Sequence, residues 1–219
     1  MMREVNIDNL SRKKTYEWFN SFSNPTYGVT VRLDVTNLVN HCKIYNESFF
    51  IDMLYIVVTA LNGIDEFRMR FVNGKPFIYD VCNPAITVMT LSDVFENVRF
   101  KYDCSFRDFY LSSKSEIDKA KNQDKLNDNG YNLDNTWDEY YITSLPWFDF
   151  TNVSHPIPDD LSSLSVPRIC WGRYVMINDK YEMSFNITVS HVFVDGYHLS
   201  KLFDSINLLL NDVDNVFKY

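Results

Sequence analysis

The amino-acid sequence predicts an α/β (α+β) fold in one domain, residues 1–219, built on a mixed, largely antiparallel sheet. Stretches with a two-residue apolar period alternate along the whole chain with stretches of helical period. Two turn signals, Asn73-Gly74 and Asn178-Asp179, separate neighbouring strand-like segments, which favours antiparallel pairs. Neither a linker-like change in composition nor an internal repeat divides the 219 residues.

The first half of the chain is predicted to hold two helices, one long strand and a set of short segments. Ser11 is placed to cap the first helix, and Asn24-Pro25 interrupts the pattern after it. A run that is apolar on most sides begins after Ser48, which is typical of a buried core helix. The expected helices span residues 12–19 and 49–61, the strand spans 29–35, and the short segments span 66–71, 76–81 and 85–90.

The second half is predicted to alternate helices, loops and strands. A helix starting at Phe106 becomes polar towards residue 121, and a surface loop rich in Asn and Asp follows it. A strand ends at Pro146, a loop with three prolines follows, and two strands flank the Asn178-Asp179 turn before a last helix. The expected loops span 122–135 and 155–167, the strands span 140–144, 168–177 and 181–191, and the last helix spans 197–210.

Composition limits the partners and the compartment. The net charge of -8 argues against nonspecific binding to nucleic acid or to an anionic membrane. The four cysteines form no Cys-x-x-Cys pair, which predicts reduced thiols in a cytosolic protein and no structural zinc site. The N-terminus lacks the apolar region of a signal peptide, and the longest apolar run, interrupted by Asp52, is too short to cross a bilayer. We expect a cytoplasmic protein without a metal, a membrane partner or a nucleic-acid partner.

The stretch from Tyr181 to Gly196 carries the strongest functional signal. Apolar and polar residues alternate from Tyr181 to Ser190, and His191 follows on the apolar side. Asp195 and Gly196 then mark the turn into a helix. A buried histidine is commonly a hydrogen-bonded core residue, but burial also keeps an imidazole neutral and able to accept a proton. His191 is therefore a candidate general base, with a core role as the alternative.

His191 and Asp195 are not expected to touch each other. Four residues of strand would separate them by about 13 Å, whereas a helix would bring them together and add His198 as a third metal ligand. The alternation that precedes His191 argues against a helix and hence against a metal site. Asp195 is instead expected at the turn, ionised, with a cation supplied from elsewhere in the chain.

Motifs along nearly the whole chain are similar to those of the chloramphenicol acetyltransferases, acetyl-CoA-dependent enzymes with a His-x-x-x-Asp-Gly motif. His191, Asp195 and Gly196 form that motif here, and Tyr197-His198 follows where the family has an aromatic residue and a histidine. Several motifs in the same order are more specific than one short motif. The others are Ser11-Arg12-Lys13-Lys14 with Tyr16, residues 26–27 and 30–36, Glu66-Phe67-Arg68-Met69, Thr87-Val88 with Phe95, Pro146-Trp147 with Phe150, and Gly172-Arg173-Tyr174.

The resemblance implies a two-layer α+β sandwich, a sheet covered by helices, in a homotrimer with active sites between subunits. It also implies acetyl-CoA as co-substrate, chloramphenicol or a similar small molecule as acceptor, and antibiotic resistance as the outcome. His191 would take the proton from the acceptor hydroxyl, which would attack the thioester directly, without an acyl-enzyme. Arg12 would pair with Asp195 and hold the catalytic turn; without the resemblance, Arg12 would count as a solvated helix residue.

The resemblance also assigns binding residues, each of which has core packing or solvent exposure as its alternative. Tyr174 would stack on the adenine of coenzyme A, Arg173 would meet a phosphate, and Trp147 is assigned to the same site. The acceptor pocket would be lined by Trp18, Phe19, Phe95 and Thr87.

Four positions depart from the family pattern. The family serine that stabilises the oxyanion corresponds to Thr143, which has the same donor but a stiffer side chain; Ser144, on the opposite face of the strand, is the fallback. Loss of such a donor costs roughly 10²–10³ in rate. Cys170 replaces a threonine, Phe19 a tyrosine, and Ser190 a second histidine. These changes leave acyl transfer expected and make the acceptor the open question.

Three functions are therefore compared. The first is chloramphenicol O-acetyltransferase, and the second is an acetyltransferase of the same fold that acts on another hydroxylated small molecule. The third is a ligand-binding or assembly protein without activity, against which the presence of His191, Asp195 and Arg12 argues. The acyltransferase core of a 2-oxoacid dehydrogenase complex shares the motif, but this sequence shows neither a lipoyl domain nor a Pro/Ala-rich linker.

Overall fold

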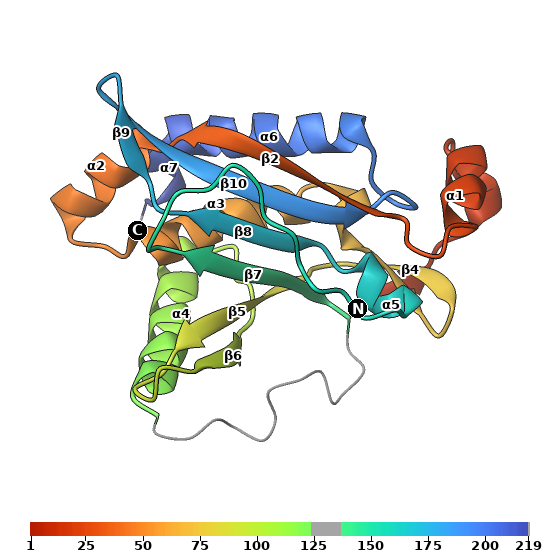
Figure 1. Ribbon diagram of the computed structural model, residues 1–219, viewed down its shortest axis with the longest axis horizontal. Helices are drawn as coiled ribbons and strands as arrows, with labels where there is room; N and C mark the ends of the chain where they lie inside the picture. Colours follow the sequence, from red (N-terminus) through yellow and green to blue (C-terminus); the bar gives the residue numbers. More distant parts are fainter. Residues whose placement is uncertain (124–136, 219) are drawn as a thin grey trace.

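The computed structural model describes residues 1–123 and 137–218 (Figure 1). Its larger sheet has seven strands, in the order β2-β10-β8-β7-β5-β6, with β9 paired to β10. Strands β8, β7 and β5 are parallel, and the pairs on either side of them are antiparallel. The mixed α/β class is therefore confirmed. The strands are β2 (Thr26–Asp34), β5 (Asn83–Met89), β6 (Phe95–Arg99), β7 (Glu139–Leu145), β8 (Arg168–Gly172), β9 (Val175–Ile177) and β10 (Lys180–Ser190).

A second, smaller sheet has the strand order β1-β4-β3. Asn73 and Gly74 connect β3 to β4 with φ values of 50° and 77°, the left-handed backbone of the type I′ turn that an Asn-Gly pair predicts. Asn178 and Asp179, with φ values of 49° and 64°, connect β9 to β10 in the same way. The strands are β1 (Met2–Glu4), β3 (Met69–Val72) and β4 (Lys75–Tyr79).

Helices α3 and α6 lie behind the large sheet in the view of Figure 1, whereas α1 lies beyond its right-hand end. Helix α3 contacts α2, α4 and α6, and ten of its residues are buried, as expected for a core helix. The apolar side of β10 (Met183, Phe185, Ile187 and Val189) is also buried, which confirms the alternation. The helices are α1 (Lys13–Asn20), α2 (Thr36–Tyr45), α3 (Phe49–Asn62), α4 (Phe106–Lys121), α5 (Leu161–Ser165), α6 (Gly196–Asn211) and α7 (Val213–Val216), with 3₁₀ turns η1 (Ile7–Asn9) and η2 (Asp65–Arg68).

Several boundaries differ from those expected. Helix α1 begins at Lys13 with Arg12 as the residue before it, so Ser11 does not cap the helix. Residues 66–71 are not one strand-like segment, because η2 precedes β3. The expected strand 168–177 is two strands, since the chain bends after Gly172, where a Cβ would lie only 3.0 Å from the Phe148 carbonyl oxygen.

Several further elements were not expected: β1, η1, α2, β6, α7 and the short helix α5 inside the predicted loop 155–167. Helix α2 has a weak apolar period and is stabilised by the burial of Leu38, Val39 and Cys42. The predicted loop 122–135 lies outside the described residues apart from its first two positions. Among the described helices, none combines the length and apolar character needed to cross a membrane.

Candidate active site

His191 lies immediately after the end of β10. Its backbone N–H donates to the Pro25 carbonyl at 2.8 Å, which continues the pairing of β10 with the segment leading into β2. The imidazole stacks on Phe19, with ring centres 3.8 Å apart and planes 9° apart, and its other side faces Tyr27 at 4.6 Å. Its Nδ1 is buried and has no hydrogen-bond partner in the described part of the chain. The ring is thus held by aromatic packing rather than by a hydrogen-bonded core position.

Arg12 holds the turn that follows His191. Its Nη1 donates to the Val192 carbonyl at 2.7 Å, and its Nη2 donates to the His191 carbonyl at 3.3 Å. The same Nη2 lies 3.6 Å from Oδ2 of Asp195. Burial lowers the pKa of Arg12, and the nearby Asp195 opposes that shift. The cation that Asp195 needs therefore comes from the start of α1.

Asp195 caps helix α6. Its Oδ1 accepts from the backbone N–H of Tyr197 at 3.0 Å and of His198 at 3.4 Å. In return, Nδ1 of His198 accepts from the Asp195 N–H at 3.1 Å, which completes a capping box. Nε2 of His198 lies 3.3 Å from Glu66, and its hydrogen bond lowers the pKa of that carboxyl. Sequence reasoning missed the capping role of His198, for which a polar residue three positions after an aspartate at a helix start was the available signal, and it missed the contact with Glu66, for which the sequence has no local signal.

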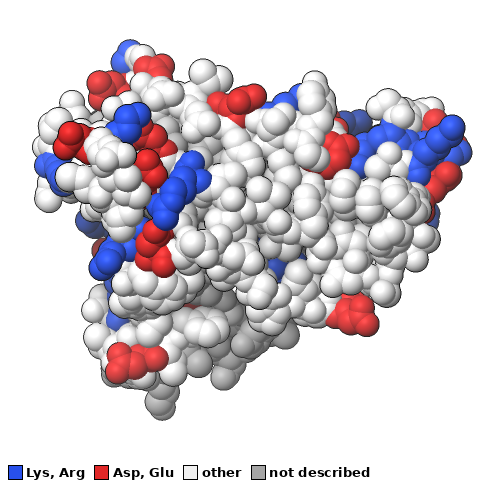
Figure 2. All heavy atoms as spheres, turned by 45° about the horizontal axis from the view of Figure 1, so that its top comes forward, with Lys and Arg blue, Asp and Glu red and all other residues white. Residues whose placement is uncertain are grey.

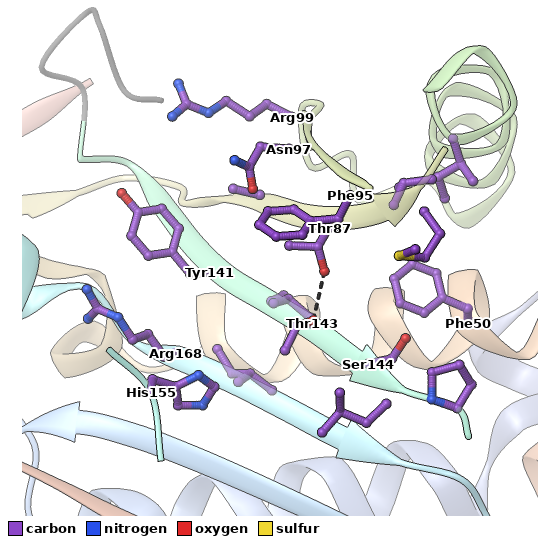
Figure 3. A pocket seen from close by; sticks show the side chains of 18 of the residues that line it. Phe50, Thr87, Phe95, Asn97, Arg99, Tyr141, Thr143, Ser144, His155 and Arg168 are labelled. Atoms are coloured by element: carbon purple, nitrogen blue, oxygen red, sulfur yellow. Dashed lines mark hydrogen bonds between the residues drawn. The ribbon is translucent and has the colours of Figure 1, made fainter. Parts of the chain in front are cut away.

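Thr143 lies in a separate part of the molecule, on β7. Its hydroxyl is 2.7 Å from that of Thr87 on β5, and both border a cavity of about 1010 Å³ (Figure 3). Phe95 and Ser144 border the same cavity. Both candidates for the oxyanion donor, Thr143 and Ser144, therefore face cavity space, and the hydroxyl of Thr143 is the one oriented by a neighbouring side chain.

The structure does not bring His191 and Thr143 together within one chain. Thr143 lies level with Cys170 on β8, which lies level with Asn186 on β10. His191 is five residues further along β10 and two strands away, a separation of about 19 Å between Cα atoms. The predicted acceptor residues fall into two groups. Phe19 packs on His191 and Trp18 packs on Phe19, whereas Thr87 and Phe95 border the cavity that contains Thr143.

The residues assigned to coenzyme A lie around β8 and β9. Tyr174 is half-buried and packs against Phe49 at 4.9 Å and Tyr181 at 5.5 Å between ring centres. Arg173 is exposed and donates its backbone N–H to the Phe148 carbonyl. The Trp147 side chain is 60% exposed and borders the Thr143 cavity. The Tyr174 ring thus has protein neighbours of its own, while Arg173 and Trp147 are open to a ligand.

Two departures from the family pattern are buried. Cys170 is inaccessible, and burial raises the pKa of its thiol to about 11, so it stays protonated at neutral pH. The hydroxyl of Ser190 is buried without a hydrogen-bond partner among the described residues. Within residues 1–123 and 137–218, no group of three or more His, Cys, Asp or Glu side chains is arranged to hold a metal ion.

Comparison with known proteins gives consistent matches. The family model described as chloramphenicol acetyltransferase matches residues 1–207. The chloramphenicol acetyltransferase of Clostridium butyricum is 27% identical over 207 residues, covering 94% of this chain and 93% of that protein. The Proteus mirabilis one is 28% identical over 203 residues, covering 92% and 91%. A solved chloramphenicol acetyltransferase matches with a TM-score of 0.87 and 25% identity, covering 96% of this chain and all of that one.

A more distant solved structure, the dihydrolipoamide acetyltransferase of Azotobacter vinelandii, shares the fold alone. Its TM-score is 0.67 at 14% identity, over 94% of this chain and 88% of that one. The fold and the matches to known acetyltransferases define an acyltransferase. Since the family model spans residues 1–207, the chain belongs to the chloramphenicol acetyltransferase family.

Proposed function

We propose that this protein is an acetyl-CoA-dependent O-acetyltransferase of hydroxylated small molecules, with chloramphenicol as the first acceptor to test. The observation that carries the proposal is the turn at residues 191–195. There Arg12 binds two backbone carbonyls and faces Asp195, while the imidazole of His191 is left free of hydrogen bonds at Nδ1 in the described structure. An imidazole that aromatic packing holds in place, with a ring nitrogen free of protein partners, is suited to general-base catalysis.

In the proposed reaction, His191 removes the proton from the acceptor hydroxyl. The hydroxyl oxygen forms a bond to the thioester carbonyl carbon, the C–S bond then breaks, and the leaving thiolate takes the proton back from His191. Thr143 would donate to the oxyanion that forms between these two steps. Thr87 supports that role: if its hydroxyl donates to Thr143 across their 2.7 Å contact, the proton of Thr143 is left for the oxyanion.

We propose that the working unit is a homotrimer with its sites between subunits. The separation of about 19 Å between His191 and Thr143 prevents one chain from placing the base and the oxyanion donor on one substrate. A second copy that brings its Thr143 cavity to His191 completes the site. Figure 2 shows a broad band of surface with few charged side chains between two charged ends, which suits a buried subunit interface.

Acetyl-CoA would bind where Arg173 and Trp147 are exposed, with Tyr174 against the adenine. We also propose that the protein is cytoplasmic and that residues 1–219 form one domain. A second candidate function is acetylation of a different hydroxylated molecule. It is favoured by Arg168, a buried cation that borders the Thr143 cavity.

The test is a thiol-release assay with purified protein, acetyl-CoA and chloramphenicol, and with His191→Ala as the control. Release of coenzyme A thiol that requires both chloramphenicol and His191 supports the proposal with chloramphenicol as acceptor. Binding of acetyl-CoA without release points to another acceptor. Failure to bind acetyl-CoA contradicts the enzymatic proposal and favours a non-catalytic role.

A further inference from the structure

Arg168 is a buried cation that faces the Thr143 cavity (Figure 3). It is the first residue of β8, and only 6% of it is exposed. Its Nη1 donates to the carbonyls of Ser163 and Val166 at 2.9 and 3.0 Å. In the described part of the chain, no carboxylate lies within 4 Å of this guanidinium, and its Nε and Nη2 make no hydrogen bond. Three of its five N–H donors therefore have no protein partner there.

A comparison with Arg70 shows why this arrangement is unusual. Arg70 is fully buried, and its donors go to the carbonyls of Phe67, Met69, Trp137 and Glu139. That side chain has a purely structural explanation, because backbone oxygens satisfy all three of its nitrogens. Nε and Nη2 of Arg168, in contrast, are not among the buried polar atoms that lack a partner in the described chain, so they are open to the cavity and can bind the acceptor oxygens of a ligand.

The surroundings of Arg168 do not neutralise it. The ring of Tyr141 lies against the guanidinium at 5.4 Å. His155 faces the same cavity. Burial and the charge of Arg168 lower the pKa of His155, so His155 does not add a second positive charge beside Arg168. Burial lowers the pKa of Arg168, and Tyr141 and Asp160, the latter beyond ion-pair distance, oppose that shift in part. Of the other charged residues that border the cavity, Arg99, Lys114 and Lys121 are cationic and Asp118 is anionic, and Arg99 pairs with Glu139 at 2.9 Å.

The register of β7 and β8 places this cation within reach of the proposed reaction. Tyr141 pairs with Arg168, and Thr143 pairs with Cys170, so Thr143 and Arg168 lie on one face of the sheet. Two residues and one strand separate their Cα atoms, a distance of about 8 Å. A molecule the size of a substituted benzene ring, with its hydroxyl at Thr143, would thus reach the guanidinium with its far end.

We infer that this cavity binds a hydroxylated acceptor that also carries a carboxylate, with the carboxylate on Nε and Nη2 of Arg168. These two donors form the fork that matches two carboxylate oxygens. The inference rests on the proposed function, since it names the acceptor class of that site. It also separates the acceptor from chloramphenicol, whose nitro group is neutral and a weak hydrogen-bond acceptor.

The test compares two probes, chloramphenicol and its analogue with a carboxylate in place of the nitro group. Binding is measured by calorimetry in a His191→Ala background, which cannot turn over, and thiol release is measured separately with His191 intact. We expect the carboxylate analogue to bind at least tenfold more tightly than chloramphenicol, and Arg168→Leu to remove that preference. Arg168→Gln retains donors for the Ser163 and Val166 carbonyls, and it keeps the test valid if the leucine variant does not fold. Lys121→Gln, which removes an exposed cation from the same cavity, should leave the ratio unchanged.

The outcomes separate this inference from the proposed function. In the His191→Ala background with Arg168 intact, equal binding of the two probes or weaker binding of the analogue overturns the inference. A binding ratio that both Arg168 variants leave unchanged overturns it as well. A preference that depends on Arg168, without thiol release, supports the cavity's ligand class and contradicts the proposed reaction. Thiol release from chloramphenicol, without a binding preference for the carboxylate analogue, supports the proposed reaction and contradicts the inferred ligand class.

Discussion

Replacing Arg12 by alanine tests the central feature of the proposed site. The change removes two charge-assisted hydrogen bonds, at 2.7 and 3.3 Å, and an ion pair at 3.6 Å whose aspartate side chain is 32% exposed. With about 1 kcal/mol for each hydrogen bond and about 1 kcal/mol for the partly exposed pair, the free energy of unfolding should fall by about 3 kcal/mol. In a protein of this size that corresponds to a melting temperature lower by about 6–12 °C.

The same variant should lose activity as well as stability. Arg12 binds the carbonyl of His191 itself, so its loss displaces the base, and a displacement of about 1 Å costs on the order of 10²-fold in rate. Thermal unfolding and kcat/KM for the thiol-release reaction are measured on one preparation. Lys13→Ala is the matched control, because Lys13 lies at the surface and its ion pairs in the described part of the chain are with Asp8 and Glu17, so its loss should leave the melting temperature close to that of wild type. An Arg12→Ala protein that matched this control in both measurements would refute the reasoning.

Three further predictions follow from the site and the core. Thr143→Ala should lower kcat by roughly 10²–10³-fold, while Thr143→Ser should retain most of the wild-type kcat. A larger loss of kcat in Ser144→Ala than in Thr143→Ala would assign the oxyanion role to Ser144 instead. Two inactive variants, His191→Ala and Thr143→Ala, should regain about a quarter of wild-type activity when refolded together in equal amounts, because about a quarter of all interfaces then join an intact His191 to an intact Thr143; no recovery would contradict sites between subunits. Burial raises the pKa of Asp52 to about 7, so the folded protein keeps a proton that the unfolded chain releases above about pH 4, and stability falls as the pH rises through that window. Asp52→Asn keeps an acceptor for Cys42, and urea unfolding should show no gain over wild type near pH 4 and a gain of about 4 kcal/mol near pH 8; a gain independent of pH would show that Asp52 is ionised in the core.

Periodicity predicted the elements whose stability comes from one uniformly buried face. The alternation through β10 and the apolar run of α3 are examples, as are the hairpin turns at Asn73-Gly74 and Asn178-Asp179, where local backbone preference decides. Helix α2 was missed because its stability comes from packing against other elements rather than from its own sequence. The N-terminus of α1 was misplaced because the long-range contacts of Arg12 outweigh the capping preference of Ser11.

The site was predictable only in part for a similar reason. A strand that delivers His191 and a turn with Asp195 can be inferred locally, and the resemblance to the family suggested the contact with Arg12 that the structure contains. The contact of His198 with Glu66 joins segments far apart in sequence, so no local pattern reveals it. The unpaired donors of Arg168 were equally hidden, since their meaning depends on which carbonyls and carboxylates the fold places around them.

The brace between Arg12 and the turn after β10 links positions 180 residues apart, which gives the order of synthesis a role in assembly. Strand β2 emerges early from the ribosome but can pair with β10 only after nearly the whole chain has been made. Closing so long a loop is slow, and until then β2 has an unpaired edge that is open to aggregation. A product truncated before residue 191 would retain the residues of the Thr143 cavity and lack the base. Catalytic competence would therefore be among the last properties that a nascent chain acquires.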